Sequence, residues 1–250
     1  MSSPNTENYF IGKGSLYFDR FDSNGNKTGE IHLGNAPDFT LTPELEKLEH
    51  FSSTKGLKTK DKEIVISAKV SAKFNLEEYT LENLKNALLA TEESFTQTAG
   101  NVTDQSVVVS RLEAYYDLGK RSISNVVVTD QTGTTTYVEG DDYTVDEVSG
   151  RIFIPETSAI AKGDTILVDY DYADLSTGTF LNIAKETKIE GVLRFKGDPA
   201  VGKAYEFYFG KVSLSATGDI ALIGDDWGKI EFTAEALKDA DGNFGKIFEI

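Results

Sequence analysis

Polar and apolar residues alternate with a period of two along much of this chain. The longest such run extends from Ile64 to Leu76, and shorter runs begin at Tyr205, Val212 and Ile230. Because successive side chains of a β-strand point to opposite faces of the sheet, this pattern predicts strands with one buried and one polar face. The chain is therefore expected to be mainly β. On the longest strand, the residues predicted to share the buried face are Ile64, Ile66, Ala68, Val70, Ala72, Phe74 and Leu76.

One segment has the period of a helix instead. Leu81, Leu84 and Leu88 recur at helical spacing, and Thr80 precedes them as a suitable N-cap. This pattern predicts a single amphipathic helix of about three turns. Its leucines are expected to cover the strand from Ile64 to Leu76.

The pattern of the sequence changes between residues 101 and 173, where short predicted strands alternate with turns rich in Gly, Asp, Ser and Thr. This change predicts a small β-rich domain (101–173) inserted into a main β-sandwich formed by residues 1–100 and 174–250. The insertion holds 13 acidic and 5 basic residues, a net charge of −8, which is half of the −16 of the whole chain. The acidity is therefore concentrated in the insertion.

Composition excludes several classes of protein. The chain has no cysteine, so disulfides, thiol nucleophiles and cysteine-based metal sites are excluded. The net charge of −16 disfavours binding to nucleic-acid phosphates and anionic membranes. The N-terminal residues show no secretory signal, and no apolar run approaches the roughly 20 residues of a membrane-spanning helix. We therefore expect a soluble protein made in a cytoplasm.

Signals for catalysis are weak. Gly197 to Lys203 matches the G-x-x-x-x-G-K phosphate loop, but Ala204 replaces the Ser or Thr that would hold Mg²⁺. The residues that follow alternate as a strand, whereas a phosphate loop needs a helix there, so a hairpin loop is expected. His32 and His50 have no catalytic partner at a suitable spacing. We therefore predict no enzyme, no catalytic residues and no cofactor, and a nucleotide enzyme that uses Lys203 is a rival hypothesis.

Two aspartate-rich segments, DSNGN (22–26) and DADGN (239–243), resemble the start of a calcium loop. Neither has the Gly at position six or the Glu at position twelve that such a loop requires, so turn formation is expected and no metal site is predicted. Trp227 follows two aspartates and precedes a glycine, which predicts a packed turn residue. The alternative function is a calcium- or glycan-binding β-sandwich module in which Trp227 stacks on a sugar.

The segment from residue 43 to 63 is strongly charged, with three glutamates near its start and four lysines in its second half. We expect a long charged loop between two strands. Such a loop either faces water or forms a bipolar extension that meets the opposite pole of a neighbouring copy, in a head-to-tail contact that generates rings or filaments. The residues concerned are Glu44, Glu46, Glu49, Lys55, Lys58, Lys60 and Lys62.

Three blocks of sequence carry a family resemblance when they are taken in order. They are GKGSLYFDRFDSNGNKTGEIHLGNAPDFTLTPELEKLEHFSSTKGLKTKD (12–61), TLENLKNAL (80–88) and GVLRFKGDPAVGKAYEFYFGKVSLSATGDIALIGDDWGKIEFTAEAL (191–237). The chain resembles the tail tube (major tail) protein of long-tailed bacteriophages over roughly residues 9–89 and 177–237. The resemblance implies a tail-tube-type β-sandwich with one flanking α-helix, of which six copies form a ring. Rings stack into the hollow tube through which DNA is ejected.

The resemblance also implies roles for particular residues. The charged loop would pack against the next ring or subunit, and the inserted domain would lie on the outer wall of the tube. The polar side of the longest strand is the candidate lumen face, on the condition that Glu44, Glu46 or other carboxylates lie across from its lysines. The candidate lumen residues are Ser67, Lys69, Ser71 and Lys73.

The partners implied by the resemblance are other tail components. They are copies of the chain itself in homo-hexameric rings, the tail tip and tail terminator proteins, and a tape measure protein inside the lumen. DNA would pass through without specific binding, and no membrane is involved. The protein would be located in the virion tail after synthesis in the host bacterial cytoplasm.

Overall fold

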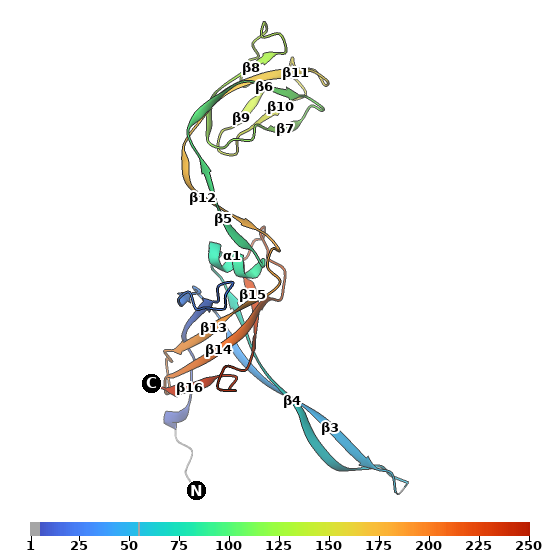
Figure 1. Ribbon diagram of the computed structural model, residues 1–250, viewed down its shortest axis with the longest axis vertical. Coiled ribbons are helices and arrows are strands. Elements are labelled where there is room, and N and C mark those ends of the chain that lie inside the picture. The colour runs from blue at the N-terminus through green and yellow to red at the C-terminus, as the bar shows by residue number, and fades with distance from the viewer. Residues whose placement is uncertain (1–5, 55) are drawn as a thin grey trace. The chain divides into compact units, whose positions relative to one another are not determined.

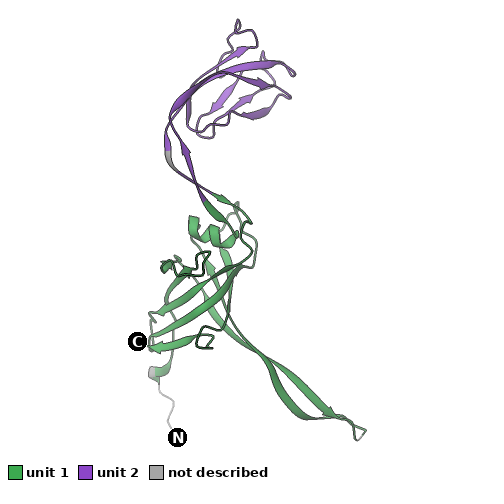
Figure 2. Ribbon diagram, in the orientation of Figure 1, with its two compact units in different colours: residues 1–92, 181–250 green, residues 93–180 purple. Residues whose placement is uncertain are grey.

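The computed structural model describes residues 6–54 and 56–250 (Figure 1). Antiparallel strands make up most of this part of the chain, with a single α-helix among them, and the predicted mainly β fold is confirmed. The chain divides into two compact units (Figure 2). The main unit consists of Met1–Glu92 and Leu181–Ile250, and the inserted unit consists of Glu93–Phe180. In the described residues, no helix is both long and apolar enough to cross a membrane.

One antiparallel sheet dominates the main unit. A short 3₁₀ helix, η1 (Thr6–Asn8), precedes it. The order of the strands in the sheet is β2-β1-β13-β14-β15-β4-β3, and β16 pairs with β14 beside this path. The strands are β1 (Gly14–Arg20), β2 (Ile31–His32), β3 (Phe39–Ser52), β4 (Thr59–Leu76), β13 (Ile189–Gly197), β14 (Tyr205–Ala216), β15 (Ile230–Ala236) and β16 (Lys246–Glu249).

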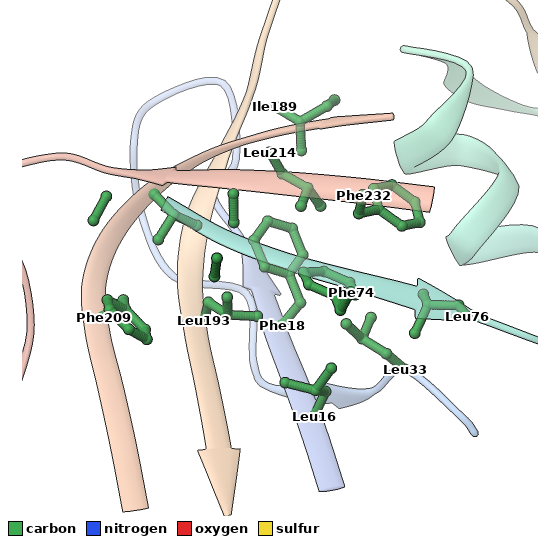
Figure 3. Close-up of a cluster of buried hydrophobic side chains, with 14 of the residues drawn as sticks. Leu16, Phe18, Leu33, Phe74, Leu76, Ile189, Leu193, Phe209, Leu214 and Phe232 are labelled. Carbon is green, nitrogen blue, oxygen red and sulfur yellow. The ribbon is translucent and has the colours of Figure 1, made fainter. Parts of the chain in front are cut away.

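The core of the main unit lies on one face of this sheet (Figure 3). Leu16 from β1, Leu193 from the neighbouring β13 and Phe74 from β4 are all buried there, although β14 and β15 separate β4 from β13 in the order of the sheet. The ring of Phe39 on β3 stacks on that of Phe195 on β13, with 5.0 Å between the ring centroids. The sheet therefore curls so that its end strand β3 approaches β13 across the core. Each fully buried large side chain contributes about 1.5–3 kcal/mol to this arrangement.

The predicted strand from Ile64 to Leu76 is present as the second part of β4, but its buried face is shorter than predicted. Ala72, Phe74 and Leu76 are buried, whereas Ile64 is 48% exposed and Ile66 is 53% exposed. The first reason is that β15 pairs with β4 only from Ser71 to Leu76. Beyond that point Val70 still packs against the core, but the apolar side chains from Ile64 to Ile66 are exposed.

A β-bulge is the second reason why the prediction of one continuous buried face is wrong. Opposite Glu46 and Lys47 of β3, β4 steps from Ser67 to Val65, so Ile66 is an extra residue. On the side of the bulge nearer the start of β4, Ile64 lies opposite Leu48. On the side nearer the core, Ala68 lies opposite Leu45. Because Leu48 lies three positions after Leu45 on β3, the two side chains point to opposite faces. Ile64 therefore does not share the face of the core residues.

The helix α1 (Leu81–Ala87) begins where the sequence predicted it. The hydroxyl of Thr80 accepts a hydrogen bond from the Asn83 N–H at 3.1 Å, so Thr80 is the N-cap. The helix has seven residues, about two turns, and packs against β14 instead of the predicted strand. Leu84 contacts the core, but Leu81 is 44% exposed. The side chain of the buried Asn83 donates to the carbonyls of Leu33 and Glu78 at 2.9 Å each.

The inserted unit contains two three-stranded sheets, β7-β10-β9 and β6-β11-β8. Its core is separate from that of the main unit and includes Val128, Ile152 and Ile166. Two further strands, β5 (Thr91–Gln97) and β12 (Leu175–Asn182), pair with each other where the chain passes between the units. The unit starts earlier and ends later than the predicted 101–173 because these two strands extend beyond it. The other strands are β6 (Gly100–Val108), β7 (Ala114–Asp117), β8 (Ile123–Asp130), β9 (Thr144–Asp146), β10 (Arg151–Ile154) and β11 (Thr165–Tyr172).

Candidate assembly surface

Strands β3 and β4 continue together well beyond the rest of the main sheet (Figure 1). They pair from Phe39 opposite Phe74 to Ser52 opposite Thr59, and only residues 53–58 join them. We call residues 43–70 the hairpin arm and residues 53–58 its tip. The prediction of a long charged loop is therefore wrong, because most of the charged segment lies in the two strands. Because neither face of this hairpin packs on a core, its strands do not need apolar residues on one face, and charged residues do not terminate them.

The hairpin arm exposes apolar side chains on both faces. Leu57 in the tip is 78% exposed, and Leu45, Leu48, Phe51, Ile64, Val65 and Ile66 are exposed along the strands. Residues 39–76 hold seven lysines and five acidic residues, a net charge of +2 in a chain of −16. Several large apolar side chains exposed along one element mark a site of interaction with another molecule.

The predicted separation of charges into two poles does not occur in the structure, because carboxylates and lysines of the arm pair with one another. Lys60 forms ion pairs with Glu49 and Glu63, and the Lys47 ammonium lies 2.6 Å from Glu63. Hydrogen bonds from Lys47 and Lys60 lower the pKa of the Glu63 carboxyl to about 2. His50 contacts Asp61 at 2.5 Å. Much of the charge on the arm is therefore balanced by ion pairs within the arm itself.

Other predicted residues of the charged segment lie apart from this ion-pair cluster. Glu44 and Glu46 lie on β3, Lys62 lies on β4 and Lys58 lies in the tip. Within the described part of the chain, Lys58 and Lys62 take part in no ion pair. Lys55 lies outside the described residues. The tip of the arm is thus apolar and basic.

The four predicted lumen residues do lie together on one polar sheet face. Ser67, Lys69, Ser71 and Lys73 are opposite Glu46, Glu44, Thr42 and Thr40 of β3. The hydroxyl of Ser67 donates to a carboxylate oxygen of Glu46 at 3.0 Å. On the other side, Glu235 and Thr233 of β15 are opposite Ser71 and Lys73. Glu44 and Glu235 thus add negative charge beside the two lysines, which is the condition for this face to line a lumen.

The edges of the arm are open. Along residues 6–54 and 56–250, no strand pairs with the outer edge of the 14-residue β3. The outer edge of β4 is likewise unpaired before Ser71. A long edge leaves a row of N–H and C=O groups that can pair with a strand from another chain. The arm therefore offers both hydrogen-bonding groups and apolar surface to a partner.

The other candidate motifs have structural roles. The G-x-x-x-x-G-K segment lies at the turn between β13 and β14, as expected, and Lys203 pairs with Glu249. The carboxylates of Asp22 and Asp239 each accept two backbone hydrogen bonds within their own turns, so the predicted turn formation is confirmed. In the described residues, no three His, Cys, Asp or Glu side chains gather as a metal cluster.

The sequence analysis missed an apolar loop between β14 and β15, residues 217–229. Trp227 is 90% exposed, so the prediction of a packed turn residue is wrong. Leu222 is 80% exposed and Ile223 is 97% exposed in the same loop. A signal was present, since these residues are apolar yet lie between glycines and aspartates without any strand alternation.

Comparison with known proteins gives two matches. The chain is 30% identical to the tail sheath protein of Burkholderia phage BcepMu over 118 residues, which are 46% of this chain. The matched segment covers 24% of that protein, so the chain spans about a quarter of the relative. Residues 9–248 also match a family described as protein of unknown function UCP028589. Because this second match includes both units almost completely, the chain belongs to that family.

Proposed function

We propose that this protein is a structural subunit of a bacteriophage tail that assembles with copies of itself. The relative named as a tail sheath protein supports a tail role. The observation that carries the proposal is the hairpin arm, which exposes apolar side chains and two unpaired strand edges. Such edges are an aggregation hazard in a monomer, and pairing with other subunits covers them.

Within the tail, we assign the subunit to the tube. Six copies form a ring in which the free edge of β3 pairs with a neighbour, and the arms hold successive rings together. The polar sheet face with Ser67, Lys69, Ser71 and Lys73 lines the lumen. Glu44 and Glu235 beside its lysines reduce their attraction for phosphates, so DNA passes through during ejection without being held.

Assembly is expected to be cooperative. Seven large apolar residues of the arm are exposed, and burying about half of each one contributes about 1 kcal/mol per residue. Association of two proteins costs about 4–15 kcal/mol in lost translational and rotational freedom. A single arm contact is therefore marginal, and a subunit held by several neighbours at once is stable.

In this proposal the protein has no catalytic residues and needs no cofactor. Its partners are other copies, the tail tip and terminator proteins, and a tape measure protein in the lumen. Its location is the virion tail, after synthesis in the bacterial cytoplasm. A sheath subunit is the second candidate, because the matched relative is named a tail sheath protein.

Negative-stain electron microscopy across protein concentration, with light scattering for mass, tests the proposal. We expect hollow tubes or six-membered rings from the purified chain alone. Assembly only around an added tail tube would favour the sheath. A monomer at every concentration, both alone and with purified tail tips as nucleators, would contradict the proposed function.

A further inference from the structure

The apolar loop of residues 217–229 is held in place although its apolar side chains lie in water. The hydroxyl of Tyr79 donates to the carbonyls of Ala221 and Lys229, at 3.1 and 3.3 Å. Gly228 lies against the same ring, because a Cβ there would be 2.7 Å from the Tyr79 hydroxyl. A loop that is fixed and exposes a tryptophan has the composition of an interface hot spot.

The apolar loop and the tip of the hairpin arm lie at opposite ends of the same strand. The loop leads into β15 at Ile230, which is opposite Leu76, the last residue of β4. The tip precedes Thr59, the first residue of β4. An 18-residue strand with a rise of about 3.3 Å per residue is roughly 55 Å long. The two surfaces therefore cannot touch within one subunit. An arrangement of copies end to end along the direction of β4 would bring the loop of one copy to the tip of the next.

The two surfaces are also complementary in charge. The apolar loop carries Asp219, Asp225 and Asp226 around its exposed side chains. The tip carries Lys58 beside Leu57, and Lys62 follows on β4. The loop is thus acidic and apolar, and the tip is basic and apolar. This complementarity favours one orientation of a contact between them.

A hollow beside the loop provides room for a side chain of the tip. Its volume is about 810 Å³, and Glu77, Tyr79, Leu222 and Trp227 are among the residues that line it. Leu57 is 78% exposed at the end of the arm and has the chemistry to enter this hollow. Asp225 on its wall can pair with Lys58.

We infer that the apolar loop of one subunit receives the tip of the hairpin arm of the next. This inference rests on the proposed self-assembly and names the surface that the arm binds. Since the two surfaces differ, the contact is heterologous, so it continues from subunit to subunit and builds a filament wherever its rotation does not close into a ring. Trp227 and Ile223 are buried in the assembled state.

Cysteine cross-linking tests the contact directly, because the chain has no cysteine of its own. Gly56→Cys places a thiol in the tip and Gly224→Cys places one in the loop, and the space around both positions is open. The two full-length variants are mixed under mild oxidation, with an affinity tag on one. The exposed Val148 of the inserted unit supplies the control, as Val148→Cys mixed with Gly56→Cys.

We expect the Gly56–Gly224 disulfide to exceed the control by on the order of tenfold, because docking raises the effective concentration of the thiols. Equal yields, or disulfides mainly between two Gly224→Cys chains, would overturn the inference. If wild-type protein forms tubes while this cross-link stays at the control level, only the loop assignment fails. If no condition produces assembly, the proposed function fails with it.

Fluorescence supplies a second readout, since Trp227 is the single tryptophan of the chain. On assembly we expect its emission to move to shorter wavelength and its quenching by iodide to fall several-fold. A polymer in which Trp227 remains as accessible as in the monomer would contradict the inference.

Discussion

A single carboxylate organises the turn that follows β8 in the inserted unit. Asp130 accepts hydrogen bonds from the N–H groups of Thr134 and Thr135, at 2.8 and 3.1 Å, and from the Thr132 hydroxyl at 2.8 Å. The hydrogen bond from the Thr135 N–H, followed by that from Thr132, lowers the pKa of Asp130 to about 2. The ionised form of Asp130 is therefore the one that stabilises the folded turn.

This residue gives the inserted unit a specific response to acid. The pKa of Asp130 is about 2 in the folded protein and near 3.8 in the unfolded chain, so its stabilisation is complete above pH 3.8 and is lost as the pH falls towards 2. We expect Asp130→Asn to lower the melting temperature at neutral pH. The difference from wild type should shrink over that acidic range in thermal melts at a series of pH values. A difference that stays constant down to pH 2 would contradict this role.

At the scale of elements, local signals could be predicted from the sequence and non-local ones could not. The N-cap at Thr80, the strand before Leu76 and the turn after Gly197 depend on neighbouring residues, and the sequence analysis predicted each of them. The bulge at Ile66 depends on the register between β3 and β4. The exposure of Trp227 depends on whether another part of the fold covers it. Neither property can be predicted from the spacing of apolar residues along the chain.

The same limit applies to the candidate site. Charge identified the segment from Glu44 to Lys62 as unusual, and alternation placed Lys69 and Lys73 on one face. The ion pair between Lys60 and Glu49 requires the hairpin to fold back on itself, which a reading of the segment as a loop does not include.

Reversal of charge at the tip tests the role of the hairpin arm. Lys58→Glu combined with Lys62→Glu should prevent polymerisation and leave a folded monomer, because these lysines support no ion pair among the described residues. Lys60 is left unchanged, since its replacement would break the pairs with Glu49 and Glu63. Light scattering measures assembly, and circular dichroism measures folding.

The matched control for this variant changes the net charge equally at another place. Lys13→Glu with Lys162→Glu alters two exposed lysines that do not belong to the arm, one in each unit. We expect this control to polymerise like wild type. Normal tubes from the tip variant, or loss of assembly in both, would argue against a specific role of the tip.

The N-cap of α1 is a second element whose contribution can be measured. Thr80→Ala removes the hydroxyl that accepts the Asn83 N–H and should cost about 1 kcal/mol of unfolding free energy in the main unit. Thr80→Ser keeps the acceptor and should cost much less. Chemical denaturation measures both variants. Equal losses would show that the Thr80 methyl group, and not the cap, is responsible.

At the scale of the whole molecule, two hydrophobic cores share one chain. The inserted unit, residues 93–180, holds 15 acidic and 5 basic residues, a net charge of −10. Its core residues belong to a cluster that includes none of those of the main unit. Each unit therefore has its own source of stability and its own response to mutation.

Calorimetry can separate the two cores. Ile152→Ala leaves a cavity at a fully buried position of the inserted unit and should lower the unfolding free energy of that unit by about 2–5 kcal/mol. Leu193→Ala does the same in the main unit. We expect each variant to lower one of two thermal transitions. Equal lowering of both transitions by either variant would mean that the units unfold as one.

The pairing of β5 with β12 makes the inserted unit interchangeable. The chain leaves the main unit on one of these strands and returns on the other, so the two crossing points are adjacent. A foreign domain with neighbouring termini can replace residues 98–174 without changing the register of any strand in the main sheet. In the proposed tube of many copies, this position would form a regular lattice for the display of cargo chosen independently of the tube itself.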